Sequence, residues 1–252
     1  MAAEIEINRN LIEISPIFKK EYLPSISVDC IVFGFHDGNL KILLVRLIHS
    51  KTWSLPGGYI KKDEDLEKGA SRILKERTGA ENIFLNQFKT FGKVNRSEQY
   101  FKDYPDDMWH KQRFLSVAYY ALTNYSLVQP EIDGFSDACE WKDINDLPDL
   151  MMDHQEMLNE ALLQLRRDLN YKPIGLNLLP EKFTMPELQK LYEVILDKEL
   201  NRGNFFRKMK RYNILTKLNE TRKGGAHKAP DLYSFNIDTY NSALENGFQE
   251  GW

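Results

Sequence analysis

Residues 53–79, WSLPGGYIKKDEDLEKGASRILKERTG, combine a pair of adjacent glycines, a turn and a charged helix, which is a pattern typical of phosphate or metal sites. Positions 73, 76 and 77 are spaced i, i+3 and i+4, so a helix brings them to one face. A Mg²⁺ site on this face would need several carboxylates, because Mg²⁺ prefers hard oxygen ligands. Glu76 supplies one carboxylate, whereas Ile73 is a hydrocarbon and Arg77 carries a positive charge. The residue types alone leave two interpretations: a catalytic helix that has lost its chemistry, or a helix that never had any.

Residues 201–228 form a strongly basic segment in a chain that is otherwise acidic. They hold nine Lys or Arg residues against the single acid Glu220, a local charge of +8. Because the whole chain has a formal net charge of −3, the remaining residues carry −11. This asymmetry indicates a polyanionic partner for the segment, although a solvated charged surface would have the same composition.

The first part of the chain has the strand and helix patterns of an α/β domain. Strands, the first two joined by the turn HDGN, are expected over 26–35, 40–48, 83–91, 113–122 and 137–142. Helices are expected over 64–78 and 147–169, where apolar residues recur at helical spacing. Two prolines and a glycine in residues 170–183 mark a boundary, so we expect one domain over 1–168 and a second over 169–252.

The second part has the order helix, helix, β-hairpin, which is that of a winged helix-turn-helix. Thr184 and Glu187 predict a capping box at the start of the first helix. Asn201 is a candidate N-cap for the second helix, RGNFFRKMKRY. Strands are expected over 214–218 and 232–237, on either side of a basic tip. The residues expected to face inward on the second helix are Phe205, Met209 and Tyr212.

The outward face of this second helix carries side chains that can read base edges in a major groove, since Arg and Lys recognise guanine and Asn recognises adenine. The candidate base-reading residues are Asn204, Arg207, Lys208 and Arg211. The residues expected to contact phosphates are Arg202, Arg222, Lys223 and Lys228. A single winged helix reads few base pairs, so we expect a homodimer on a palindromic operator in double-stranded DNA. A basic helical hairpin that binds a protein is the alternative.

Composition excludes several other classes of protein. The chain has 252 residues, of which 42% are hydrophobic, so it can bury a sizeable core. Its two cysteines, Cys30 and Cys139, have no CxxC spacing, which argues against a disulfide framework or a zinc site. The N-terminus lacks the pattern of a signal peptide, and no apolar run is long enough to span a membrane. We therefore expect a cytoplasmic protein without a membrane partner.

The glycine-helix pattern resembles the Nudix box, G-x5-E-x7-R-E-U-x-E-E-x-G-U, in which U is aliphatic. The matching residues are Gly58, Glu64, Arg72, Leu74, Glu76 and Gly79, with Ala80 a weak match at the last position. Ile73 and Arg77 stand where the pattern has glutamates. The resemblance implies a Nudix α/β/α sandwich, in which Glu64 and Arg72 form an orienting ion pair. A Nudix domain followed by a winged helix, over roughly residues 20–237, is similar to the Nudix-related transcriptional regulators of the NrtR family.

The resemblance is strongest to sugar-responsive members of that family, in particular arabinose-responsive regulators. It implies a repressor of sugar-utilisation genes, with a catalytically inactive Nudix domain as its sensor and a sugar such as L-arabinose as its effector. We expect no cofactor and no metal site, because the carboxylates are missing. Five residues are candidate effector contacts. Asp29 places a carboxylate within an apolar strand, Lys51 and Trp53 precede LPGG, and the aromatic residues Tyr100 and Trp109 belong to the insert 97–113.

Two alternatives stay open. ADP-ribose, which other members of the family sense, is a second candidate effector. A Nudix hydrolase that acts on a nucleoside diphosphate derivative would need Glu76 together with carboxylates from elsewhere, such as Asp103, Asp106 or Asp107.

Overall fold

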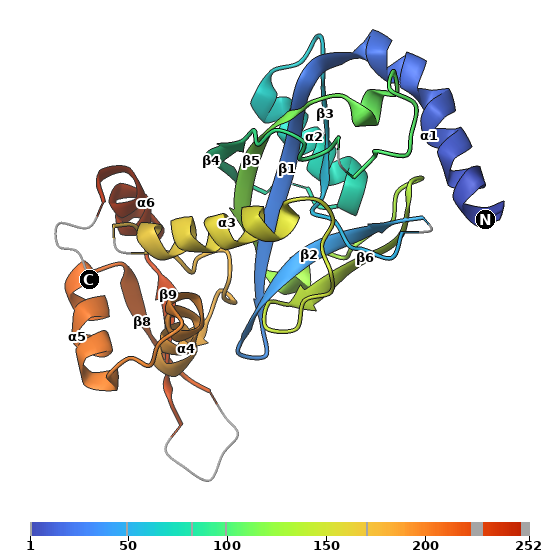
Figure 1. The fold of residues 1–252 in the computed structure, drawn as a ribbon. Coiled ribbons are helices and arrows are strands. Elements are labelled where there is room, and N and C mark those ends of the chain that lie inside the picture. The colour runs from blue at the N-terminus through green and yellow to red at the C-terminus, as the bar shows by residue number, and fades with distance from the viewer. Residues whose placement is uncertain are drawn as a thin grey trace. The chain divides into compact units, whose positions relative to one another are not determined.

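Strand β1 (Tyr22–His36) is the centre of the sheet that organises the N-terminal part of the chain (Figure 1). The computed structural model describes residues 2–48, 50–81, 83–98, 100–169, 171–222 and 229–247, with side chains described from residue 12 onward. Residues 27–34 of β1 are buried without a break, as expected for a central strand covered on both faces.

The sheet has six strands, five of them in the order β4 (Leu85–Phe91), β5 (Leu115–Leu122), β1, β2 (Asn39–Leu47) and β6 (Ser136–Asp143). The sixth strand, β3 (Gly57–Lys61), pairs antiparallel with β1, whereas β5 runs parallel to β1. The predicted hairpin is confirmed: β1 and β2 are joined by a turn in which Asp37 and Gly38 have φ values of 50° and 73°. Two consecutive positive φ angles are the requirement of a tight β-hairpin turn, which an Asp-Gly pair meets well.

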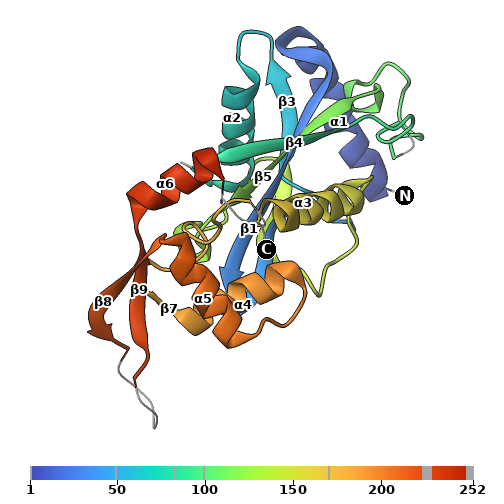
Figure 2. The same cartoon turned by 90° about the vertical axis from the view of Figure 1, so that its left-hand side faces the viewer.

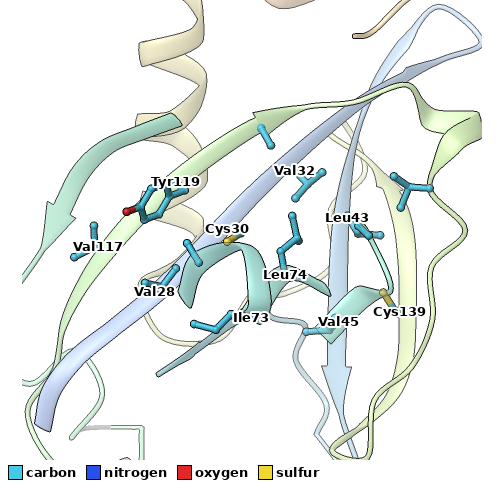
Figure 3. Packing of buried hydrophobic residues seen from close by; sticks show 14 of the residues in the cluster. Val28, Cys30, Val32, Leu43, Val45, Ile73, Leu74, Val117, Tyr119 and Cys139 are labelled. Carbon is cyan, nitrogen blue, oxygen red and sulfur yellow. The ribbon is translucent and has the colours of Figure 1, made fainter. Parts of the chain in front are cut away.

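Two helices complete an α/β/α arrangement. Helices α2 (Leu66–Thr78) and α3 (His154–Asp168) lie on opposite sides of the sheet (Figures 1 and 2). Ile73 and Leu74 of α2 pack against Val28, Cys30 and Val117 of the sheet, and all five side chains are less than a tenth exposed (Figure 3). Ile73 therefore belongs to the core of this unit as well as to the Nudix helix.

The C-terminal part forms the predicted winged helix. Helix α4 (Met185–Leu196) begins with the expected capping box, because Glu187 N–H donates to the Thr184 hydroxyl and Thr184 N–H donates to the Glu187 carboxylate. Asn201 caps helix α5 (Arg202–Tyr212) by accepting from Asn204 N–H at 3.0 Å. The wing consists of β8 (Leu215–Thr221) and β9 (Asp231–Phe235), and β7 (Phe183–Thr184) pairs with β9.

Several predicted element boundaries are wrong. The helix expected over 147–169 begins only at His154, since Leu150 instead forms a bridge with Trp53. The segment expected as a turn before the Nudix helix contains strand β3. Helices α1 (Ala2–Glu21) and α6 (Ile237–Asn246) were not expected, and α6 begins where the second wing strand was expected to end. On α5, Phe205 and Met209 are buried as predicted, but Tyr212 is only partly buried.

The chain forms two compact units. The first comprises Met1–Phe33, Lys41–Leu122 and Ser126–Ala161, and the second comprises Gly34–Leu40, Thr123–Tyr125 and Leu162–Trp252. Both β1 and α3 therefore begin in the first unit and end in the second. The expected division of the chain after residue 168 stays a prediction. In the described part of the chain, no helix has the length and apolar character needed to cross a membrane.

Candidate effector pocket and nucleic-acid interface

A pocket of about 440 Å³ lies in the first unit, beside the Nudix helix. Such a volume is within the range of small-molecule sites. Its wall is largely aromatic and includes Phe18, Tyr59, Phe101, His110, Phe114 and Phe135. Its charged side consists of Arg72, Glu76, Arg77 and Asp133. We call the buried lining residues Asp29, Arg96 and His154 the polar floor.

On the charged side, Arg72 joins three parts of the Nudix loop and helix. Its guanidinium donates to Glu64 at 2.5 and 2.9 Å, to Glu76 at 2.7 Å and to the Tyr59 carbonyl at 2.9 Å. The ion pair between Glu64 and Arg72 is therefore present, with both side chains largely buried. Hydrogen bonds from Arg72 hold the pKa of Glu64 below its usual value. The Glu76 carboxylate, the one acid left on the catalytic face, is thus held by a cation of its own helix.

Arg77 does not pair with its neighbour Glu76, which is bound by Arg72. It forms an ion pair with Asp133, 56 residues further along, and both side chains are largely buried. Ile73 packs against Gly58, where a Cβ atom would approach its side chain to 3.2 Å. The face that carries residues 73, 76 and 77 therefore does line the pocket, as its spacing predicts.

These residues do not suit the metal ions that a Nudix box holds. Ile73 has no ligand atom, Arg77 repels cations and Glu76 is paired with Arg72. In the described part of the chain, no group of three or more His, Cys, Asp or Glu side chains could hold a metal ion. The acids considered as substitutes, Asp103, Asp106 and Asp107, do not line the pocket. Of these, Asp106 pairs with Lys111 at 2.8 Å and Asp107 with Lys19 at 3.6 Å.

The polar floor is a buried network around Asp29, a residue that is 7% exposed. Asp29 Oδ2 accepts from the Ser116 hydroxyl at 2.5 Å and lies 3.7 Å from Arg96 Nη2. Arg96 donates two hydrogen bonds to Asp153, at 2.8 and 2.7 Å. Gly57 lies against Asp29, and a Cβ atom there would fall on the Asp29 carboxylate. Gly57, which precedes the first glycine of the Nudix pattern, is thus required by the buried carboxylate on the neighbouring strand.

His154 completes the floor at the first residue of α3. Its Nδ1 accepts from Leu55 N–H at 3.0 Å, and burial lowers its pKa. A neutral imidazole whose Nδ1 is an acceptor carries its proton on Nε2. Nε2 is buried without a hydrogen-bond partner in the described part of the chain, and it lies 3.7 Å from Asp29 Oδ1.

Of the predicted effector contacts, only Asp29 lines the pocket. Trp53 packs outside it between Arg46 and Lys142, because the strand alternation turns Ser54 rather than Trp53 toward the pocket. Lys51 is exposed outside the lining.

The predicted aromatic contacts lie just outside the lining. Tyr100 is 40% exposed and its hydroxyl lies 3.4 Å from that of Thr52, while the next residue, Phe101, lines the pocket. Trp109 is buried behind the wall, where it packs against Tyr59 and Phe114. The insert 97–113 thus does border the pocket, but through other side chains than those expected.

Sequence reasoning missed Arg96 and His154 of the floor and Tyr59 of the wall. Arg96 and His154 belong to no motif, and Tyr59 occupies a position that the Nudix pattern leaves unspecified, so the sequence offered no indication of them. Burial of His110 lowers its pKa to about 4, which keeps this wall residue neutral near pH 7.

The second unit presents the candidate nucleic-acid interface. Phe205 and Met209 hold α5 in the core, which leaves Arg202, Asn204, Arg207 and Arg211 exposed and Lys208 partly buried. Arg207 donates to Asn204 Oδ1 at 2.5 Å, so the two side chains lie together on the helix surface. The helix therefore presents a basic face at the spacing that the sequence indicated.

Of the wing residues expected to contact phosphates, the structure describes Arg222. Arg222 forms an ion pair with Glu187 of the α4 capping box, which limits its use as a phosphate contact. Lys223 and Lys228 lie outside the described residues.

Comparison with known proteins agrees with this architecture. Residues 23–161 match the family described as the NUDIX domain, and residues 175–235 match the family described as the NrtR DNA-binding winged helix domain. The crystal structure of Shewanella oneidensis NrtR complexed with a 27mer DNA is similar with a TM-score of 0.71 and 29% identity. The similarity covers 90% of this chain and 99% of that chain.

Two further proteins are similar over most of the chain. An Acinetobacter baylyi protein named "ADPR responsive transcriptional repressor NtrR" is 29% identical over 86% of this chain and 84% of its own length. A MutT/nudix family protein from Enterococcus faecalis has a TM-score of 0.64 with 18% identity, and covers 89% of this chain and 93% of its own. This last similarity concerns the fold alone.

Replacing Glu64 by Gln should lower the free energy of unfolding by about 1–3 kcal/mol near pH 7, because a neutral amide cannot replace a carboxylate that accepts two charge-assisted bonds. The pKa of Glu64 is lower in the folded than in the unfolded chain. Its contribution is therefore complete above about pH 5 and is lost as the pH falls through the folded pKa. Urea unfolding of the two proteins between pH 3 and 8 should show the difference shrinking in acid.

The exposed Glu13, which makes no ion pair in the described part of the chain, gives a matched control in E13Q. An E64Q variant as stable as E13Q at pH 7 would contradict the role given to the ion pair.

Proposed function

We propose that this chain is a ligand-responsive transcriptional repressor. It belongs to the Nudix family and continues into a winged helix of the NrtR type. The proposal of DNA binding rests on α5, whose exposed face is basic and whose opposite face is apolar and buried. A helix of this kind, capped and held by a hydrophobic core, suits insertion into a major groove. The similar Shewanella oneidensis protein was crystallised with DNA, which supports the same use here.

The Nudix unit is proposed to be a sensor rather than an enzyme. Diphosphate hydrolysis in this family depends on carboxylates that gather metal ions, and here one position is Ile73 and another is Arg77. The remaining acid, Glu76, is bound by Arg72. What stays is a pocket with aromatic walls and a polar floor, which can bind a ligand without reacting with it.

We propose a neutral sugar as the effector, with L-arabinose as the first candidate. Every arginine among the described lining residues already holds a carboxylate: Arg72 holds Glu64 and Glu76, Arg77 holds Asp133, and Arg96 holds Asp153. A diphosphate would have to break one of these pairs or bring its own cation. Sugar hydroxyls can instead use the polar floor, while the apolar faces of the ring pack on the aromatic wall.

The relative from Acinetobacter baylyi is named for its response to ADPR, and no relative supports the choice of arabinose. ADP-ribose is accordingly the second candidate effector. The internal neutralisation of the pocket charges is the reason to place the neutral sugar first.

The expected mechanism is a population shift in a homodimer. An effector changes DNA binding only if its affinities for the DNA-compatible and DNA-incompatible states differ. A ligand that favours the second state would misalign the two winged helices with the half-sites of a palindrome. Binding of the effector would then release the operator.

Selection of random duplexes by the protein at physiological salt should enrich a palindrome. On the selected duplex, R207A should cost about 1–3 kcal/mol and relax the base preference at one position of each half-site. R202A should weaken binding to all sequences alike and reduce the slope of log K against log[salt] by about 1 per protomer. Fluorescence anisotropy at several salt concentrations measures both effects.

The exposed Lys172, which lies outside α5 and the wing, provides the control K172A. No enriched sequence, or a salt dependence as shallow as that of a protein contact, would favour the protein-binding alternative.

L-Arabinose should bind the protein in calorimetry and weaken its affinity for the selected duplex, while ADP-ribose should do neither. The physical reason is the lack of an uncommitted cation in the described pocket lining. Unchanged operator affinity with L-arabinose and with other pentoses would refute the choice of a sugar. Release by ADP-ribose alone would establish the second candidate.

ADP-ribose and other nucleoside diphosphate derivatives should give no Mg²⁺-dependent hydrolysis above background. The expected result follows from the loss of metal ligands at positions 73 and 77. Phosphate-release assays, with a hydrolytic Nudix enzyme as the positive control, provide the measurement. Turnover that needs Mg²⁺ and disappears in E76Q would instead make the protein a hydrolase.

A further inference from the structure

The polar floor contains a donor and an acceptor that face each other without making a bond. His154 Nε2 and Asp29 Oδ1 are 3.7 Å apart, which is too long for a hydrogen bond. Their side chains are 1% and 9% exposed, and both residues line the pocket. A buried N–H without a partner costs free energy, so such a group calls for an occupant.

The chemical roles of the two atoms are determined by their other contacts. Leu55 N–H donates to His154 Nδ1 at 3.0 Å, so the Nε2 atom of the neutral ring is the donor. Ser116 donates to Asp29 Oδ2 at 2.5 Å, and Asp29 Oδ1 makes no hydrogen bond in the described part of the chain. The floor therefore offers one N–H donor and one carboxylate acceptor side by side.

We propose that Asp29 and His154 together bind one hydroxyl group of the effector, an inference that rests on the proposed function of the pocket. A hydroxyl oxygen can lie about 2.8 Å from both atoms, accept from His154 Nε2 and donate to Asp29 Oδ1. A hydroxyl satisfies both at once, whereas an ionised phosphate oxygen accepts only and would be repelled by Asp29. The pair is thus a specificity determinant for polyhydroxyl ligands.

The two residues also lie on the elements that continue into the second unit. Asp29 belongs to β1 and His154 begins α3, and both elements end within the second unit. A hydroxyl bound to both side chains links these two elements where they face the pocket. Loss of either contact should therefore weaken the effect of the ligand on DNA binding as well as its affinity.

The first variant is H154N, because the Asn carbonyl can replace Nδ1 as the acceptor for Leu55 N–H while the Nε2 donor is lost. The second is D29N, which keeps the shape of the side chain and removes its charge. The control is D146N at an exposed loop position outside the pocket. Thermal melting establishes that each variant is folded before calorimetry with L-arabinose and, separately, with ADP-ribose.

For the sugar that binds the wild-type protein, H154N and D29N should each lose about 10- to 100-fold in affinity, and D146N should not change. Monodeoxy analogues, each lacking one hydroxyl, test the direct contact. The analogue that lacks the contacted hydroxyl should bind the wild-type protein about 10- to 100-fold more weakly than the parent sugar does. H154N should bind this analogue no more weakly than it binds the parent sugar. Additive losses for every analogue would show a merely structural role and would overturn the proposal.

If H154N and D29N bind L-arabinose as tightly as the wild-type protein does, this inference is overturned and the proposed effector stands. Binding of ADP-ribose alone would overturn the proposed effector instead. In that case the same variants decide the inference with ADP-ribose, whose ribose hydroxyls offer the same chemistry: a loss supports it and equal affinity refutes it. Failure of both ligands to bind would overturn both proposals.

Discussion

The guanidinium of Arg72 is the interaction on which the first unit depends. It binds Glu64 of the loop, the Tyr59 carbonyl of β3 and Glu76 of its own helix, so it fixes the turn, the strand and α2 relative to one another. The same contact occupies the last acid of the catalytic face. The architecture of this region therefore depends on one side chain. A metal ion at this face would have to compete with Arg72 for Glu76, because a carboxylate that neutralises a buried arginine is a poor ligand for a metal ion.

Neutralisation of charge continues through the rest of the pocket. Arg77 is matched by Asp133 and Arg96 by Asp153, so the pocket has polar character without an uncompensated cation. The proposal of a neutral effector rests on this balance, since burying a further negative charge costs free energy unless a cation compensates it. The aromatic wall offers apolar contact area, and His154 Nε2 is a buried donor without a hydrogen-bond partner in the described part of the chain.

Local patterns predicted much of the fold. The Asp-Gly hairpin turn, the capping box of Thr184 and Glu187 and the buried face of α5 each depend on residues close in the chain, and all three are present. The start of α3 was misplaced because Leu150 pairs with Trp53, a contact that helical periodicity does not reveal. The N-terminal helix escaped notice, although its residue Phe18 helps to line the pocket beside Tyr22, the first residue of β1.

By itself, the sequence determined that residues 73 and 77 bring no carboxylate to the Nudix face and that α5 carries a basic surface, because both properties depend only on residue type and helical spacing. Only the tertiary structure decided which side chains reach the pocket. It turned Trp53 away, paired Arg77 with Asp133 across 56 residues and placed His154 beside Asp29. These outcomes depend on strand pairing and helix packing, which join segments whose separation in the sequence carries no periodic pattern.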